Sequence, residues 1–90
     1  MAMLIRLRAV NPDRNLDREY LIQLQRTLFR EYSLTMVYGR YGCQGRKRMK
    51  LFDTEAAALK VASAIIKKRL ASAGRLGVAY QVVESSGDWN

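Results

Sequence analysis

The sequence predicts an α+β fold, in which an antiparallel sheet of about five strands packs against a single amphipathic helix that precedes the last strand. Apolar and polar residues alternate through the first half of the chain, and short turn-forming segments interrupt the alternation. The apolar period then becomes helical before a last strand pattern appears. Because short turns join neighbouring antiparallel strands, the first four strands should form a meander. We expect one domain over residues 1–84 and a flexible tail over residues 85–90.

Strict alternation predicts the first two strands. Residues 3–10, MLIRLRAV, and residues 18–29, REYLIQLQRTLF, each gather apolar side chains on one face. Residues 11–17 between them contain Asn-Pro and two aspartates, which favour a turn because proline fixes its torsion and Asn or Asp can bond the local backbone. The apolar faces consist of Met3, Ile5, Leu7, Ala9, Tyr20, Ile22, Leu24 and Leu28.

The third and fourth strands are predicted to continue the meander. Residues 30–33 indicate a tight connection, and residues 34–42, LTMVYGRYG, are rich in β-branched and aromatic residues. Residues 42–45 supply a glycine-containing turn, and residues 46–52, RKRMKLF, return as a strand. Alternation separates the side chains of this strand, with Arg46, Arg48 and Lys50 on one face and Met49 and Leu51 on the other.

A helix and a last strand complete the predicted fold. Asp53 is the expected N-cap, Glu55 complements the helix dipole in the first turn, and Gly74 is the expected stop. Residues 78–83, VAYQVV, predict the last strand, and the remaining ESSGDWN, which contains Trp89, shows no pattern. The apolar stripe of the helix consists of Leu59, Val61, Ala62, Ile65, Ile66, Leu70 and Ala73.

The composition excludes most catalytic and metal chemistry. The chain has no histidine, which is the commonest general base and metal ligand, and Cys43 is its single cysteine. One cysteine makes no internal disulfide and cannot hold zinc alone, so Cys43 is interpreted as an incidental exposed thiol in a reducing compartment. We therefore expect no enzyme activity, no cofactor and no metal site.

The charge balance indicates an anionic partner. Sixteen Lys and Arg residues against eight Asp and Glu residues give a net charge of +8. Nucleic acid is the first candidate and an anionic membrane the second, while a charge that serves solubility alone is the third reading. No apolar run reaches the roughly 18 residues of a membrane span, and no signal-peptide pattern opens the chain. We expect no membrane partner and a cytoplasmic protein, which would associate with the nucleoid if it binds DNA.

Residues 37–50, VYGRYGCQGRKRMK, combine five cationic residues, three glycines and two tyrosines with no carboxylate. The cations suit phosphate oxygens, the glycines permit close approach of a ligand backbone, and the rings can stack on bases. The alternative is a solvated hairpin whose tyrosines pack in the core. Arg6 and Arg8 lie on the same sheet face as Arg46, Arg48 and Lys50 only if the strand register allows it. The candidate nucleic-acid-binding residues are Tyr38, Gly39, Arg40, Tyr41, Arg46, Lys47, Arg48 and Lys50.

Several segments in order resemble the WGR domain family, which is named for a Trp-Gly-Arg segment. YGRYGCQG keeps the glycine spacing of that segment, with Tyr38 in the place of the tryptophan. Residues 15–20, NLDREY, and residues 25–29, QRTLF, are similar to two motifs of the bacterial branch. LFDTEAAALKVASAIIKKRL matches the aromatic-then-helix portion, so the resemblance covers about residues 4–80.

The resemblance implies an antiparallel sheet with one helix, as the residue pattern does. Family members in poly(ADP-ribose) polymerases bind DNA, particularly at breaks, where the tryptophan stacks on a terminal nucleotide and the arginine contacts the backbone. Carried onto this chain, stacking falls on Tyr38 and the phosphate contact on Arg40. A tyrosine ring offers a smaller stacking face, so the substitution implies weaker capping of DNA ends.

These observations predict a noncatalytic nucleic-acid-binding module. DNA is the expected partner, with ends or nicks as candidate targets, and RNA is an alternative because stacking and phosphate contacts serve both. The competing hypothesis is a protein–protein interaction domain that docks on an acidic partner or self-associates. Lys60, Lys67, Lys68 and Arg69 could extend the basic surface, but a solvated helix face is the favoured interpretation. Oligomeric state does not follow from the sequence.

Overall fold

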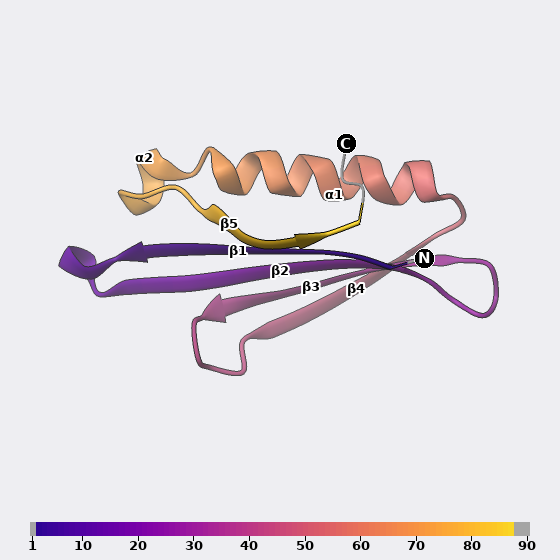
Figure 1. The fold of residues 1–90 in the computed structure, drawn as a ribbon, viewed down its shortest axis with the longest axis horizontal. Helices are drawn as coiled ribbons and strands as arrows, with labels where there is room; N and C mark the ends of the chain where they lie inside the picture. Colours follow the sequence, from indigo (N-terminus) through magenta and orange to yellow (C-terminus); the bar gives the residue numbers. More distant parts are fainter. Residues whose placement is uncertain (1, 88–90) are drawn as a thin grey trace.

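The computed structural model describes residues 2–87 and contains a five-stranded sheet with a long helix along one face (Figure 1). All neighbouring strands are antiparallel, in the order β4-β3-β2-β1-β5. The predicted α+β class, the meander and the helix before the last strand are confirmed. The elements are β1 (Ala2–Asn11), a 3-10 turn (Pro12–Arg14), β2 (Leu16–Arg26), β3 (Tyr32–Arg40), β4 (Arg46–Phe52), α1 (Glu55–Leu70), α2 (Ala73–Leu76) and β5 (Gln81–Ser86).

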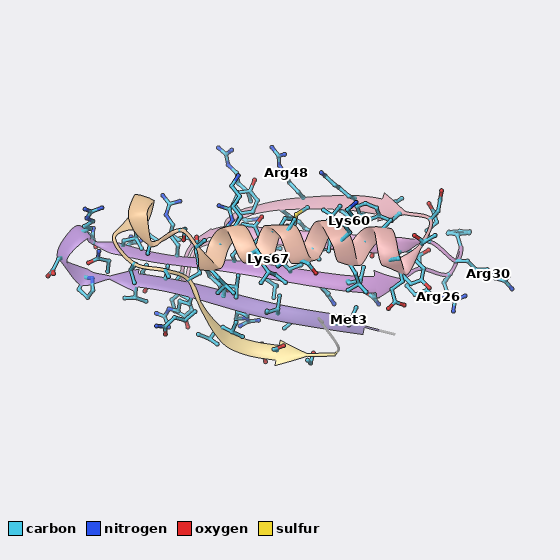
Figure 2. The ribbon with its side chains drawn as sticks, turned by 90° about the horizontal axis from the view of Figure 1, so that it is seen from above. Met3, Arg26, Arg30, Arg48, Lys60 and Lys67 are labelled. Atoms are coloured by element: carbon cyan, nitrogen blue, oxygen red, sulfur yellow. The ribbon has the colours of Figure 1, made fainter. Side chains whose placement is uncertain are left out.

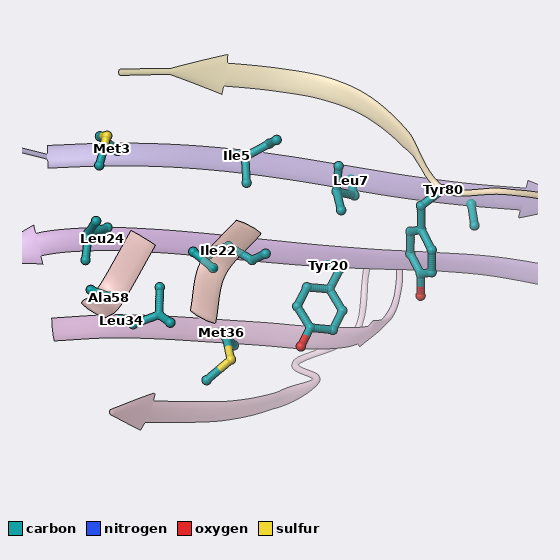
Figure 3. Packing of buried hydrophobic residues seen from close by; sticks show 12 residues of the cluster. Met3, Ile5, Leu7, Tyr20, Ile22, Leu24, Leu34, Met36, Ala58 and Tyr80 are labelled. Carbon is teal, nitrogen blue, oxygen red and sulfur yellow. The ribbon is translucent and has the colours of Figure 1, made fainter. Parts of the chain in front are cut away.

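The hydrophobic core lies between α1 and one face of the sheet, which we call the helix side; the other face is the open side. Alternate residues of β1, β2 and β3 point to the helix side (Figure 3). On the helix, Ala58 and Ala62 are fully buried, and their small side chains let α1 lie close to the sheet. All residues of the predicted apolar faces are buried except Leu28. Among the described residues, the buried core consists of Met3, Ile5, Leu7, Ala9, Tyr20, Ile22, Leu24, Leu34, Met36, Ala58, Ala62 and Tyr80.

The turn between β2 and β3 starts earlier than predicted, and the assignment of Leu28 to a strand face is wrong. Thr27 ends the strand, because its hydroxyl accepts hydrogen bonds from the backbone N–H of Phe29 (3.2 Å) and of Glu31 (3.3 Å). The N–H of Thr27 donates to the carbonyl of Glu31 at 2.8 Å, which closes the turn. As a result β2 stops at Arg26 instead of residue 29.

The turn between β3 and β4 depends on two glycines that lie against each other. A Cβ atom added to Gly39 would lie 2.9 Å from the Cα of Gly45, and one added to Gly45 would lie 2.8 Å from the carbonyl oxygen of Tyr38. Gly45 also has a φ of 72°, in the left-handed region that favours glycine. These two glycines therefore allow the close approach of the protein's own backbone, and both also line the cleft described below.

Both ends of the helix differ from the prediction. Thr54, not Asp53, is the N-cap, and its side chain accepts a hydrogen bond from the N–H of Ala57 at 3.1 Å. The helix ends at Leu70, four residues before the expected stop at Gly74, which lies inside α2. Leu70, the last residue of α1, and Ala73, which lies in α2, are exposed, whereas the other predicted stripe residues face the core or its edge.

The last strand lies three residues later than predicted. Val78 and Tyr80 precede β5, and Tyr80 enters the core instead of forming part of a strand. Ser85 and Ser86, which were expected to belong to the flexible tail, pair with β1, as does Glu84. The prediction about Trp89 falls outside the described residues.

Candidate nucleic-acid interface

Three cations of β4 form a row on the helix side, beyond the edge of the core. Arg48 lies opposite Met36 and Lys50 opposite Leu34, both of which are core residues. These cations therefore lie on the face of the sheet that α1 covers, at the β4 edge of that face. Figure 2 shows Arg48 at the edge of the sheet beside α1, with Lys60 on the helix. We call Arg46, Arg48 and Lys50 the β4 cation row. Alternate residues of a strand are about 6.7 Å apart, so the row presents evenly spaced charges.

The cations of this row form no ion pair with any described residue, and all three side chains are exposed. The ion pairs in the described part of the chain are Arg6 with Glu84 (3.5 Å) and Arg8 with Asp17 (2.9 Å). The pairing register places Arg6 and Arg8 on the open side, so they do not extend the row. Carboxylates therefore neutralise part of the open side and leave the β4 cation row available for an external anion.

Tyr38 lies on the helix side, next to Arg46 of the row. Its ring stacks on Tyr20 with centroids 5.2 Å apart and an interplanar angle of 11°. One face of the Tyr38 ring is thus occupied by the protein, and the residue packs against the core while remaining partly exposed. The ring can offer a ligand its remaining face and edge, which is less than a free aromatic platform.

The same stack includes a cation that the sequence interpretation assigned to a solvated helix face. The guanidinium carbon of Arg69 lies 4.7 Å from the centroid of Tyr20, and Tyr80 meets Tyr20 edge-on with centroids 6.4 Å apart. Arg69 is half-buried at the end of α1, so its charge lies beside the aromatic cluster. Arg69 lies seven residues after the core residue Ala62, which is the one feature of the sequence that could have placed it on the sheet-facing side of the helix.

Arg40 is exposed but already has partners. Its guanidinium donates hydrogen bonds to the backbone carbonyl of Asn15 (3.0 Å) and to the side-chain oxygen of Asn15 (3.2 Å). Asn15 has a φ of 50°, a left-handed conformation that asparagine tolerates better than most residues. Arg40 therefore fixes the turn before β2, and its N–H groups that point away from Asn15 are the ones that a phosphate could use.

Tyr41 and Lys47 lie on the open side, away from the β4 cation row. The guanidinium of Arg8 lies 3.7 Å from the centroid of the Tyr41 ring and also donates two hydrogen bonds, of 3.0 and 2.9 Å, to the Asp17 carboxylate. Those hydrogen bonds hold the pKa of Asp17 below its ordinary value and raise the pKa of Arg8. Lys47 pairs with Val37, which lies across the sheet from Arg6, so Lys47 and Arg6 are on the same open side.

A cleft of about 630 Å³ joins the predicted residues to the turn before β2. It brings together Tyr38, Arg40 and Arg46 and adds Arg14 and Arg18, which sequence reasoning did not select as binding residues. These two arginines precede Tyr38 by at least 20 residues, and the pairing of β2 with β3 brings their segment to the cleft. The cleft and the β4 cation row meet at Arg46, so together they form one cationic surface with an aromatic edge.

Other kinds of site find no support in the part of the chain that the structure describes. Residues 2–87 hold no group of His, Cys, Asp and Glu side chains that could bind a metal ion. No helix within these residues has both the length and the apolar character needed to cross a membrane. Cys43 is exposed in the turn between β3 and β4.

The fold and this surface define a small module with an antiparallel sheet, one covering helix and a cationic cleft at the Tyr-Gly-Arg segment. The WGR domain family matches residues 3–73, which is most of the chain. The protein therefore belongs to the WGR domain family, a family of the nucleic-acid-binding type. No curated protein matches the chain.

Proposed function

We propose that this protein is a noncatalytic DNA-binding module that holds a DNA backbone along the β4 cation row and in the adjoining cleft. The observation that supports the proposal best is the row of Arg46, Arg48 and Lys50, which forms no ion pair with residues 2–87 and lies beside a cleft that contains further arginines. Phosphate contacts from such a row position a protein on nucleic acid without reading its sequence. In the cell, such a module would lie in the cytoplasm with the nucleoid.

Fluorescence anisotropy with labelled duplex DNA at several salt concentrations tests the proposal. If about five phosphates are neutralised, the logarithm of affinity should fall with the logarithm of salt concentration at a slope of about −4 to −5. The same titration with single-stranded RNA of equal length separates a DNA preference from general affinity for polyanions. A flat salt response, or no binding at low salt, would contradict the proposal.

The open side supports a second candidate function, namely docking on another protein. Met49 is 60% exposed and Leu51 is 53% exposed on this face, next to half-buried Val37. A surface of this kind, with cations at its border, suits an acidic protein partner or a second copy. Capture of a partner that persists after nuclease treatment would favour this function, whereas capture that disappears would favour nucleic acid.

A further inference from the structure

The tip of the β2–β3 turn displays two large apolar side chains to solvent. Leu28 is 99% exposed and Phe29 is 84% exposed, the highest values among the large apolar residues that the structure describes. Nothing in the described fold needs these side chains, because they contribute no surface to the core. A fully hydrated leucine–phenylalanine pair gains free energy when another molecule removes it from water.

Hydrogen bonds close the turn at the tip, so the apolar pair is presented in a defined position. The Thr27 hydroxyl accepts hydrogen bonds from the N–H groups of Phe29 and Glu31, and the carbonyl of Thr27 accepts one from Arg30 at 3.3 Å. Arg30 adopts a φ of 64°, which reverses the chain directly after Phe29. Because the backbone is already ordered, a ligand that binds here avoids much of the entropy cost of fixing a loop.

Two arginines flank the apolar pair, and one carboxylate, Glu31, follows them in the same turn. Arg26 and Arg30 flank the pair and project from the end of the molecule (Figure 2). The register places Arg26 beside Tyr32 and Phe52, on the helix side and one cross-strand row beyond Lys50. The distance along β4 from Arg46 to the end of the strand is about 20 Å. One cationic track therefore leads from the cleft to the tip.

We propose that Leu28 and Phe29 form a wedge that inserts between adjacent base pairs of a DNA duplex bound along this track. The inference rests on the proposed function and assigns it a second contact. Apolar side chains that enter a base step unstack it and bend the duplex, while neighbouring arginines hold the phosphates on either side. A two-residue tip is small for a stable protein interface, and its arginine flanks together with the adjoining row favour a polyanion.

Fluorescence of 2-aminopurine placed beside a flexible TA step in a duplex reports unstacking directly. The wild-type protein should raise this fluorescence and should bend the duplex, as measured by energy transfer between its ends. The double variant Leu28→Ser/Phe29→Ser should lose both signals and bind on the order of tenfold more weakly. Its salt slope should not change, because every cation remains.

Two further variants separate the wedge from general effects. Met49→Ser/Leu51→Ser removes exposed apolar side chains from the open side and should leave 2-aminopurine fluorescence at the wild-type level. Thr27→Val keeps Leu28 and Phe29 but removes the hydroxyl that orders the tip, so the unstacking signal should fall while the salt slope is retained.

Binding of DNA by the wild type with no rise in fluorescence would overturn the wedge and leave the proposed function intact. Absence of any DNA binding in anisotropy would overturn both. Co-sedimentation with phosphatidylserine vesicles is the remaining comparison. Two results together would show that the tip contacts lipid and that the DNA wedge is wrong. The wild type would bind vesicles without raising 2-aminopurine fluorescence, and the Leu28→Ser/Phe29→Ser variant would lose the vesicle binding.

Discussion

At the residue scale, Tyr38 differs from a free stacking residue because part of its ring packs within the protein. Its ring supports Tyr20, and through Tyr20 it adjoins Arg69 and Tyr80. The part of the ring that lines the cleft is the part available to a terminal nucleotide. The substitution of tyrosine for the family's tryptophan therefore coincides with a ring that is partly committed to the fold.

Replacement of Tyr38 by alanine should weaken binding to blunt or nicked duplexes by on the order of tenfold and leave binding to closed circular DNA nearly unchanged. The reason is that stacking requires an exposed terminal base pair, whereas phosphate contacts do not. Competition between nicked and closed circles of the same sequence measures the difference, with Tyr38→Phe as the control that keeps the ring. Equal loss on both substrates would show that Tyr38 acts through the fold.

A second residue-scale prediction concerns Asp17, whose pKa is lowered by its hydrogen bonds with Arg8. A lowered folded-state pKa stabilises the fold above the ordinary value of 3.8, and this contribution is lost as pH falls through the folded-state value. The Tm difference between wild type and Asp17→Asn should be constant above about pH 5 and should shrink below about pH 4. Thermal melts across this range measure it, with Asp13→Asn as the control. A pH-independent difference would contradict the assignment.

At the scale of single elements, β4 shows why alternation alone does not locate a binding surface. The sequence correctly separates its cations from Met49 and Leu51, but it does not say which group lies on the covered side. No residue of β4 is fully buried, and Phe52 alone among its apolar residues packs against the core from the helix side. Met49 and Leu51 therefore remain on the open side, and the cations of the strand border the helix. An edge strand with charged side chains is also protected from pairing with other chains.

Lys50 and Lys47 provide a matched test of this element, because they lie on one strand, carry the same charge and point to opposite faces. Lys50→Gln should reduce the magnitude of the salt slope by about 0.9, since one phosphate contact is lost. Lys47→Gln should leave the slope unchanged, because Lys47 lies away from the row. The anisotropy titration measures both, and similar effects of the two variants would indicate diffuse attraction instead of a defined contact face.

Other elements show where sequence information runs out. The strand pattern runs past Thr27 because Leu28 keeps the alternation, yet a single hydroxyl redirects the backbone and ends β2. Thr54 and not the predicted Asp53 is the N-cap, because Thr54 has the extended torsions of that position and its side chain accepts the hydrogen bond from Ala57. Such decisions depend on local hydrogen bonds that hydrophobic periodicity does not contain.

At the scale of the whole molecule, the protein is an elongated body of 46 × 25 × 19 Å with two chemically different faces. The fold class, the meander of the first four strands and most of the core follow from the sequence, because burial imposes a regular period. The pairing of β5 with β1 does not follow from it. The cleft does not follow, since it joins Arg18 to Tyr38 and Arg46 across three strands. Of the residues predicted for one site, the structure places Tyr41 and Lys47 on the open side and gathers four at the cleft, namely Tyr38, Gly39, Arg40 and Arg46.

The contact between Gly39 and Gly45 determines more than the shape of a turn. Because side chains alternate along a strand, a shift of one residue in the pairing of β4 would exchange its two faces. Arg46, Arg48 and Lys50 would then point away from the helix, and Met49 and Leu51 would replace them there. Because a Cβ atom at Gly39 or Gly45 would clash with the facing backbone, these glycines permit the turn from which this register, and with it the side of the positive charge, continues.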